Sequence, residues 1–115
     1  MNNRDAASLW DAIQAIRQIQ EFIGQSSYED YLQSNLLRSA VERQLEILGE
    51  ATRRMSEDFQ QAHPDIDWRN LIGLRNAIAH QYEKVQHDTI WEIVIVRLPG
   101  LLKKLEPLLP AAPEE

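Results

Sequence analysis

Apolar residues recur at steps of three and four along almost the whole chain, and this spacing constrains the fold more than any other feature of the sequence. One such run is Leu9, Ile13, Ile16, Ile19 and Ile23. An α-helix turns once every 3.6 residues, so residues spaced in this way share one face and can be buried together. The alternating pattern of a half-buried strand is missing, and the chain has only four glycines. The periodicity therefore predicts an all-α protein.

Helix start and stop signals divide the first half of this pattern into two predicted helices. The first covers residues 5–23 and ends at Gly24, a residue type favoured just after a helix. A long second helix covers residues 28–61, and His63 ends it because a residue before proline avoids the helical region. The apolar face of the second helix consists of Leu32, Leu36, Ala40, Leu45, Leu48, Met55 and Phe59.

Two further helices are predicted in the second half of the chain. Asp67 is a suitable N-cap for a third helix, which runs from residue 68 to about residue 80 or 82. Thr89 and Glu92 have the spacing of a capping box and open a fourth helix. Pro99 is expected to kink or split this last helix, because its ring displaces a carbonyl group one turn back. The apolar face of the fourth helix consists of Ile90, Val94, Leu98, Leu101, Leu105 and Leu108.

The length of the chain, 115 residues, fits one compact domain. We predict an antiparallel four-helix bundle over residues 1–106, followed by a flexible, proline- and glutamate-rich tail over residues 107–115. The chain has no cysteine, its first residues lack the apolar core of a signal peptide, and no apolar run approaches the ~20 residues of a membrane span. These features predict a cytoplasmic protein without a membrane partner.

The net charge of −6 opposes a nucleic-acid function at first sight, because RNA and DNA are polyanions. The charge is uneven, however: −3 over residues 1–37, −1 over residues 38–82 and −2 over residues 83–115. Residues 68–82 contain two arginines and no acidic residue. Arginine offers a planar group of donors that suits phosphate. The middle of the chain is therefore the best place for contact with a phosphate backbone.

The second predicted helix carries two sets of charged residues whose interpretation is open. They are Arg38, Arg53 and Arg54, and Glu42, Glu46 and Glu50. The arginines either extend a positive patch or are ordinary solvated or ion-paired residues. The glutamates share an i,i+4 row, which is either the start of a metal site or, as we favour, a solvated face paired with arginines.

Of the three histidines, only His80 has neighbours that suggest chemistry. No two histidines have the spacing of a metal site, so we predict neither a metal nor another cofactor. His63 in a His–Pro loop and His87 before the fourth helix are expected to be structural. His80 ends a segment that also contains Arg75, Asn76 and Tyr82.

Arg75 and His80 are separated by about 140° around an ideal helix, so one helix does not bring their side chains together. Two copies of the segment facing each other across a two-fold axis would remove this difficulty. Such a site has what metal-free RNA cleavage needs. A histidine can take the proton of a ribose 2′-OH or deliver one to the leaving oxygen, and a guanidinium group can stabilise the transition state. From the spacing alone, a structural histidine at a helix end remains the alternative.

Residues 68–82 resemble the signature of the HepT-like ribonuclease toxins of the HEPN superfamily. That signature is an arginine, a polar residue, three further residues, a histidine, one residue and a tyrosine. In this sequence the matching residues are Arg75, Asn76, His80 and Tyr82. Residues 43–51 resemble the second-helix block of the family and residues 93–99 resemble its last helix, so the resemblance covers about residues 5–106.

The resemblance implies an all-α HEPN-type homodimer, the toxin of a type VII toxin–antitoxin pair, that cleaves mRNA or tRNA without a metal ion. Arg75 and His80 would form the catalytic pair in a cleft between subunits, supported by Asn76. Tyr82 matches the tyrosine that receives AMP from ATP through the partner antitoxin, a minimal nucleotidyltransferase of the MntA type. A bulky anionic adduct beside the cleft would exclude RNA by its volume and charge.

Two other interpretations stay open. Tyr82 is otherwise a helix-end aromatic residue that packs on the core. The whole chain is otherwise a non-catalytic helical dimer that binds a nucleotidyltransferase or RNA without turnover, since such a protein would have the same motif.

Overall fold

The computed structural model describes residues 2–80 and 87–110, with the backbone alone at residues 75, 77, 79 and 80. These described residues are helical almost throughout and contain no strand, which confirms the all-α prediction. The α-helices are α1 (Asn3–Ile23), α2 (Tyr28–Gln33), α3 (Asn35–Arg53), α4 (Glu57–Ala62), α5 (Trp68–His80), α6 (His87–Glu92) and α7 (Leu98–Leu105). A π-helical segment, η1 (Ile93–Arg97), joins α6 to α7, and a 3-10 turn, η2 (Glu106–Leu108), follows α7. None of the helices described is long and apolar enough to cross a bilayer.

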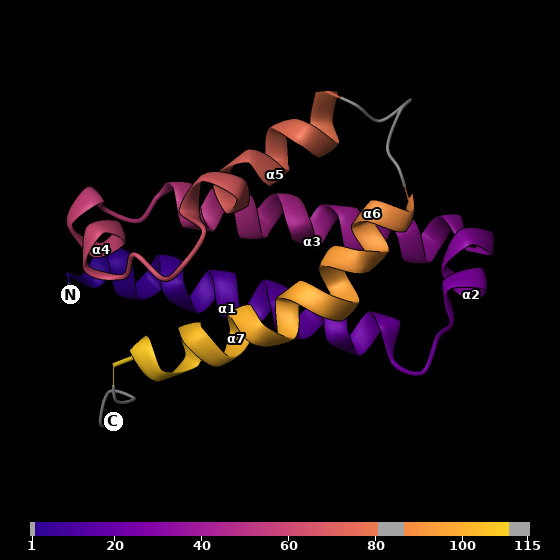
Figure 1. Ribbon diagram of the computed structural model, residues 1–115, viewed down its shortest axis with the longest axis horizontal. Coiled ribbons are helices and arrows are strands. Elements are labelled where there is room, and N and C mark those ends of the chain that lie inside the picture. The colour runs from indigo at the N-terminus through magenta and orange to yellow at the C-terminus, as the bar shows by residue number, and fades with distance from the viewer. Residues whose placement is uncertain (1, 81–86, 111–115) are drawn as a thin grey trace.

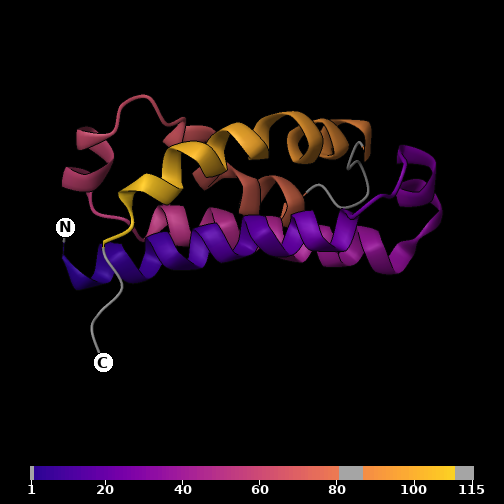
Figure 2. The same cartoon turned by 90° about the horizontal axis from the view of Figure 1, so that it is seen from below.

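The two long helices, α1 and α3, lie side by side and run in opposite directions (Figure 1). α5 packs on α3, and α7 packs on α1, so that both lie on the same side of the two long helices (Figure 2). The five apolar residues predicted for the face of the first helix are all buried. Leu45 and Leu48 of α3 are completely buried as well. The two long helices therefore provide the base on which α5 is held.

The predicted second helix, residues 28–61, is wrong as a single element, because it forms the three helices α2, α3 and α4. Ser34 separates the first two, and its hydroxyl oxygen accepts a hydrogen bond from the Leu37 N–H at 3.0 Å. Arg38 donates to the carbonyl oxygens of Tyr31 and Leu32, the last groups of α2. Side chains that satisfy the free backbone groups at a helix end favour a break there.

The second break, between α3 and α4, has the same cause. The hydroxyl oxygen of Ser56 accepts from the Phe59 N–H at 3.1 Å and so caps α4. These breaks change the predicted apolar face. Leu32 and Leu36 are 38% and 83% exposed, whereas Met55 and Phe59 are buried as predicted.

The C-terminal helix begins at His87 and not at the predicted capping-box residue Thr89. The Thr89 N–H instead donates to the Asp88 side chain at 2.9 Å, within the first turn of α6. The helix then widens into η1, where the Leu98 N–H donates to the Ile93 carbonyl oxygen, just before Pro99. Proline disturbs an α-helix in the turn that precedes it, so this change of geometry occurs where it was predicted.

The first residues of the predicted tail lie against the domain. Leu108 and Leu109 are partly buried on the core, and residues 111–115 lie outside the described residues. A flexible tail therefore stays a prediction for these last residues.

Candidate functional site

α5 carries three of the four residues singled out in the sequence. Arg75, Asn76 and His80 lie in its C-terminal half, whereas Tyr82 lies outside the described residues. Asn76 is exposed, and Ile78 beside it is 7% exposed and belongs to the core. The helix continues to His80 without unwinding, so the backbone positions of Arg75 and His80 stay about 140° apart around its axis. One copy of α5 does not bring these two residues onto one face.

The N-terminal end of α5 is fixed by local hydrogen bonds and aromatic packing. The Asp67 side chain accepts from the Asn70 N–H at 3.5 Å and from the Asn70 side-chain amide at 2.6 Å, as expected of an N-cap residue. The Trp68 indole N–H donates to the His63 carbonyl oxygen at 3.0 Å. The rings of Trp68 and Phe59 pack edge to face at 5.9 Å, and those of Phe59 and His63 lie 4.7 Å apart. These contacts agree with the structural role predicted for His63.

The arginines of α3, and Arg54 directly after it, are engaged in local contacts. Arg54 lies 3.4 Å from Asp11, and Arg53 forms an ion pair with Glu50. Arg43 lies 3.7 Å from Glu46. These contacts agree with the second interpretation of the charged residues, in which the glutamate row faces arginines.

Glu42 differs from the rest of its row, because it lies in a partly buried group with His87 and Tyr31. Burial raises the pKa of Glu42, and the nearby charges of His87 and Arg38 act in the opposite direction. Burial also raises the pKa of Tyr31. The Tyr31 hydroxyl and the Nδ1 atom of His87 are buried, and neither has a hydrogen-bond partner among the residues the structure describes. The rings of Tyr31 and His87 are 6.3 Å apart and almost perpendicular.

The described side chains contain no group of three histidines or carboxylates that is close enough to hold a metal ion. In the glutamate row, Glu46 and Glu50 lie beside arginines, and Glu42 is partly buried near His87. The interpretation of this row as a metal site therefore gains no support from the geometry.

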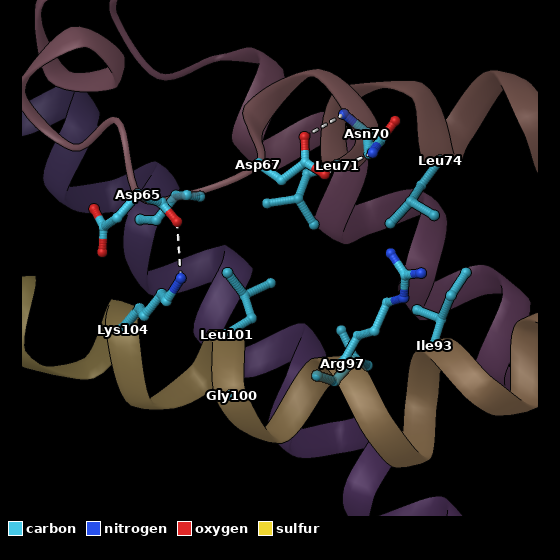
Figure 3. Close-up of a pocket in the computed structure, with 12 residues that line it drawn as sticks. Asp65, Asp67, Asn70, Leu71, Leu74, Ile93, Arg97, Gly100, Leu101 and Lys104 are labelled. Carbon is cyan, nitrogen blue, oxygen red and sulfur yellow. Dashed lines mark hydrogen bonds between the residues drawn. The ribbon is translucent and has the colours of Figure 1, made fainter.

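A cavity that was not foreseen in the sequence lies between α5 and the η1–α7 arm (Figure 3). Its volume is about 330 Å³. It is lined by Asp65, Ile66, Asp67, Asn70, Leu71, Leu74, Ile93, Arg97, Leu98, Gly100, Leu101 and Lys104. Half of these residues come from the C-terminal arm, where the apolar periodicity predicted only core packing. The proline in the last helix was the one available signal, because it marks the point where the arm departs from α-helical geometry beside the cavity.

Comparison with known proteins gives consistent matches over most of the chain. The profile of a family described as "Ribonuclease HepT-like" matches residues 12–108. A candidate RNase of Methanocaldococcus jannaschii is 34% identical over 107 residues, which cover 92% of this chain and 98% of the relative. A protein of Thermococcus cleftensis with the name "Probable ribonuclease HepT" is 37% identical over 100 residues, which cover 87% of this chain and 91% of the relative. No solved structure gives a significant match.

Proposed function

The chain belongs to the ribonuclease HepT-like family, and on this basis we propose that it is an endoribonuclease, the toxin of a prokaryotic toxin–antitoxin pair. The observation that carries this proposal is the motif on α5 within the matched region. An arginine, an asparagine and a histidine with the family spacing lie on one continuous helix that is exposed at Asn76. The two ribonuclease-named relatives, each matched over most of its length, support the same activity.

In the proposed reaction, His80 moves protons and Arg75 binds the phosphate. The imidazole takes the proton from a ribose 2′-OH, whose oxygen attacks the adjacent phosphorus, or it gives a proton to the leaving 5′-oxygen. The guanidinium group of Arg75 stabilises the charge that develops on the phosphoryl oxygens. Asn76 supports the phosphate by hydrogen bonding. No step requires a metal ion.

The separation of Arg75 from His80 around α5 favours an active homodimer. In a two-fold arrangement of HEPN-type four-helix domains, Arg75 of one subunit and His80 of the other can face the same groove. Dimerisation also concentrates positive charge in this groove, because residues 68–82 of each subunit contain two arginines and no acidic residue. The net charge of −6 is therefore compatible with RNA binding at this groove.

The proposed control of the toxin is the transfer of AMP to Tyr82 by an MntA-type minimal nucleotidyltransferase. The hydroxyl oxygen of Tyr82 attacks the α-phosphorus of ATP, pyrophosphate leaves, and the proton goes to solvent. Co-expression with the cognate nucleotidyltransferase should add the mass of one AMP to the peptide that contains Tyr82. Relief of toxicity with this peptide unmodified would contradict the mechanism and favour simple sequestration.

Cleavage of RNA by the purified protein in EDTA tests the proposed function. We expect cleavage by the natural sequence, and its loss on His80→Gln or Arg75→Gln. His63→Gln and Arg43→Gln are matched controls, since His63 packs on Phe59 and Arg43 lies beside Glu46 on α3. RNA binding without cleavage would overturn the proposal in favour of the non-catalytic dimer.

A further inference from the structure

The cavity between α5 and the η1–α7 arm has the build of a small-ligand site. Its volume of about 330 Å³ is at the lower end of the range of roughly 300–1,000 Å³ that is usual for such sites. A cavity of this size can hold one nucleoside but not a folded segment of RNA. Its apolar walls are provided by Leu71 and Leu74 of α5 and by Leu98 and Leu101 of α7. Apolar walls on two sides suit a planar ring.

The polar groups of this cavity are separated into two ends (Figure 3). Arg97 lies at one end, and its guanidinium group points toward α5 near Leu74. Its side chain is 64% exposed, and its one ion pair within the described part of the chain is a long contact of 3.9 Å to Glu92. Arg97 is thus free to bind an anion at the mouth of the cavity.

The opposite end carries Asp67 and Asn70. Their side chains are joined at 2.6 Å, which leaves one amide oxygen of Asn70 and further lone pairs of Asp67 for a ligand. Lys104, the second cation of the cavity, already donates to the Asp65 carbonyl oxygen at 2.8 Å and so ties the loop before α5 to α7. The Asp67 carboxylate at this end disfavours a phosphate there. The cavity is therefore polarised, with its anion-binding end at Arg97.

The Arg97 end is also the end nearer to the motif. Leu74 directly precedes Arg75 in α5, and Leu71 lies one turn before it. A phosphate held at Arg97 is consequently on the side of the cavity toward the proposed catalytic residues. A nucleotide with its phosphate at this end would extend its base between the leucines toward Asn70.

We propose that this cavity binds one nucleotide of the RNA substrate, the one that flanks the scissile phosphate, and that it selects the base. This proposal rests on the proposed ribonuclease function. Arg97 binds the phosphate, the leucines enclose the base, and Asn70 with Asp67 recognises its polar edge. Amide and carboxylate side chains discriminate between bases through the donors and acceptors on base edges.

The central test blocks the cavity without disturbing the fold. A side-chain carbon added at Gly100 meets no other atom within 4 Å, and Gly100 lines the cavity. Gly100→Leu therefore adds a large side chain at the cavity wall without a clash at its Cβ and is expected to narrow the cavity, and Gly100→Ala is its matched control. With a random-sequence RNA, we expect the natural protein to prefer one base beside the cleaved bond. Gly100→Leu and Asn70→Ala should reduce this preference about tenfold, the ratio expected when one good base contact is lost.

Arg97→Gln should lower the rate of cleavage for all bases without changing the preferred base, since its proposed contact is to phosphate. Arg43→Gln is the matched control, because Arg43 is exposed on α3 beside Glu46 and is not part of the cavity. Cleavage by Gly100→Leu with an unchanged base preference would overturn the proposed cavity role and leave the ribonuclease function intact.

A binding measurement keeps the two proposals separable if the natural protein does not cleave RNA. The four 3′-nucleoside monophosphates are titrated into the protein while the NMR signals of Gly100 and of the Asn70 side-chain amide are followed. We expect shifts of both signals with at least one nucleotide, and their loss in Gly100→Leu. Unchanged signals with all four nucleotides would overturn the cavity as a nucleotide site.

Discussion

Asp5, near the start of α1, binds Ser56, which lies 51 residues later at the start of α4. One carboxylate oxygen accepts from the Ser56 N–H and the other from its hydroxyl, both at 2.7 Å. Asp5 is only 3% exposed. Ser56 in turn caps α4. This contact fixes the joint between α3 and α4, so that the chain returns toward α5 in a defined direction.

Asp5→Ala is expected to lower the free energy of unfolding by about 3 kcal/mol, because it leaves two donors of Ser56 without their charged acceptor. Urea denaturation measures this loss. Asp11→Ala is the matched control on the same helix, since Asp11 is half exposed and reaches Arg54 only at 3.4 Å. It should change stability by about 0.5 kcal/mol or less. Equal effects of the two substitutions would contradict the role of Asp5.

The sequence predicted the helices well where apolar spacing and burial agree, as in α1 and α5. It failed where side chains bind nearby backbone. Ser34 and Ser56 interrupt the predicted second helix because their hydroxyl groups cap new helices, and Arg38 binds the last carbonyl groups of α2. Such side-chain contacts to the backbone hardly change the spacing of the apolar residues, so this spacing does not show where the helix breaks.

The candidate site likewise has one part that the sequence predicted and one part that it did not. The positions of Arg75 and His80 on one helix follow from local periodicity. The cavity depends on packing between segments distant in the chain, because Asn70 and Arg97 line one cavity only where the arm packs over α5. The π-helical turn before Pro99 affects which residues of the arm face the cavity. Neither feature has a signal in the spacing of the apolar residues.

Tyr31→Phe is expected to raise the free energy of unfolding by about 1 kcal/mol. Tyr31 is completely buried, and its hydroxyl has no hydrogen-bond partner within residues 2–80 and 87–110. Removal of a buried, unsatisfied polar group relieves its desolvation penalty. Thermal and urea denaturation measure the change, with Tyr28→Phe as the half-buried control. A clear loss of stability in Tyr31→Phe would show that the hydroxyl does have a partner.

Gly24 and Gly73 are expected to respond to alanine in opposite directions. Gly24 follows α1 with a φ of 51°, a region that side chains rarely adopt, so Gly24→Ala should lower stability by about 1 kcal/mol. Gly73 lies within α5, and an added carbon meets nothing within 4 Å, so Gly73→Ala should raise stability by up to about 1 kcal/mol. Denaturation of both variants at one protein concentration measures the difference. Destabilisation by both would contradict the free space at Gly73.

Glu42→Gln is expected to stabilise the protein, and more so at pH 7 than at pH 4. Burial raises the pKa of Glu42 above its unfolded value, against the attraction of His87 and Arg38 and with the repulsion of Glu46. The folded state therefore binds the proton more tightly, and stability from this group is lost as the pH rises through the raised pKa. Glutamine carries no charge at either pH. Denaturation at the two pH values, with Glu29→Gln as the exposed control, measures the effect, and a larger gain at pH 4 would contradict it.

Binding of single-stranded RNA should depend on salt in proportion to the number of phosphates that the protein contacts. The logarithm of the affinity falls with the logarithm of salt by about 0.7 for each phosphate neutralised on a single strand. If Arg97 binds a phosphate at the mouth of the cavity, Arg97→Gln lowers this slope by about 0.7, because one counterion fewer is released. Fluorescence anisotropy with the His80→Gln protein measures binding without cleavage. Arg43→Gln should leave the slope unchanged, since Arg43 faces Glu46 on α3. An unchanged slope in Arg97→Gln would show that Arg97 does not contact the RNA backbone.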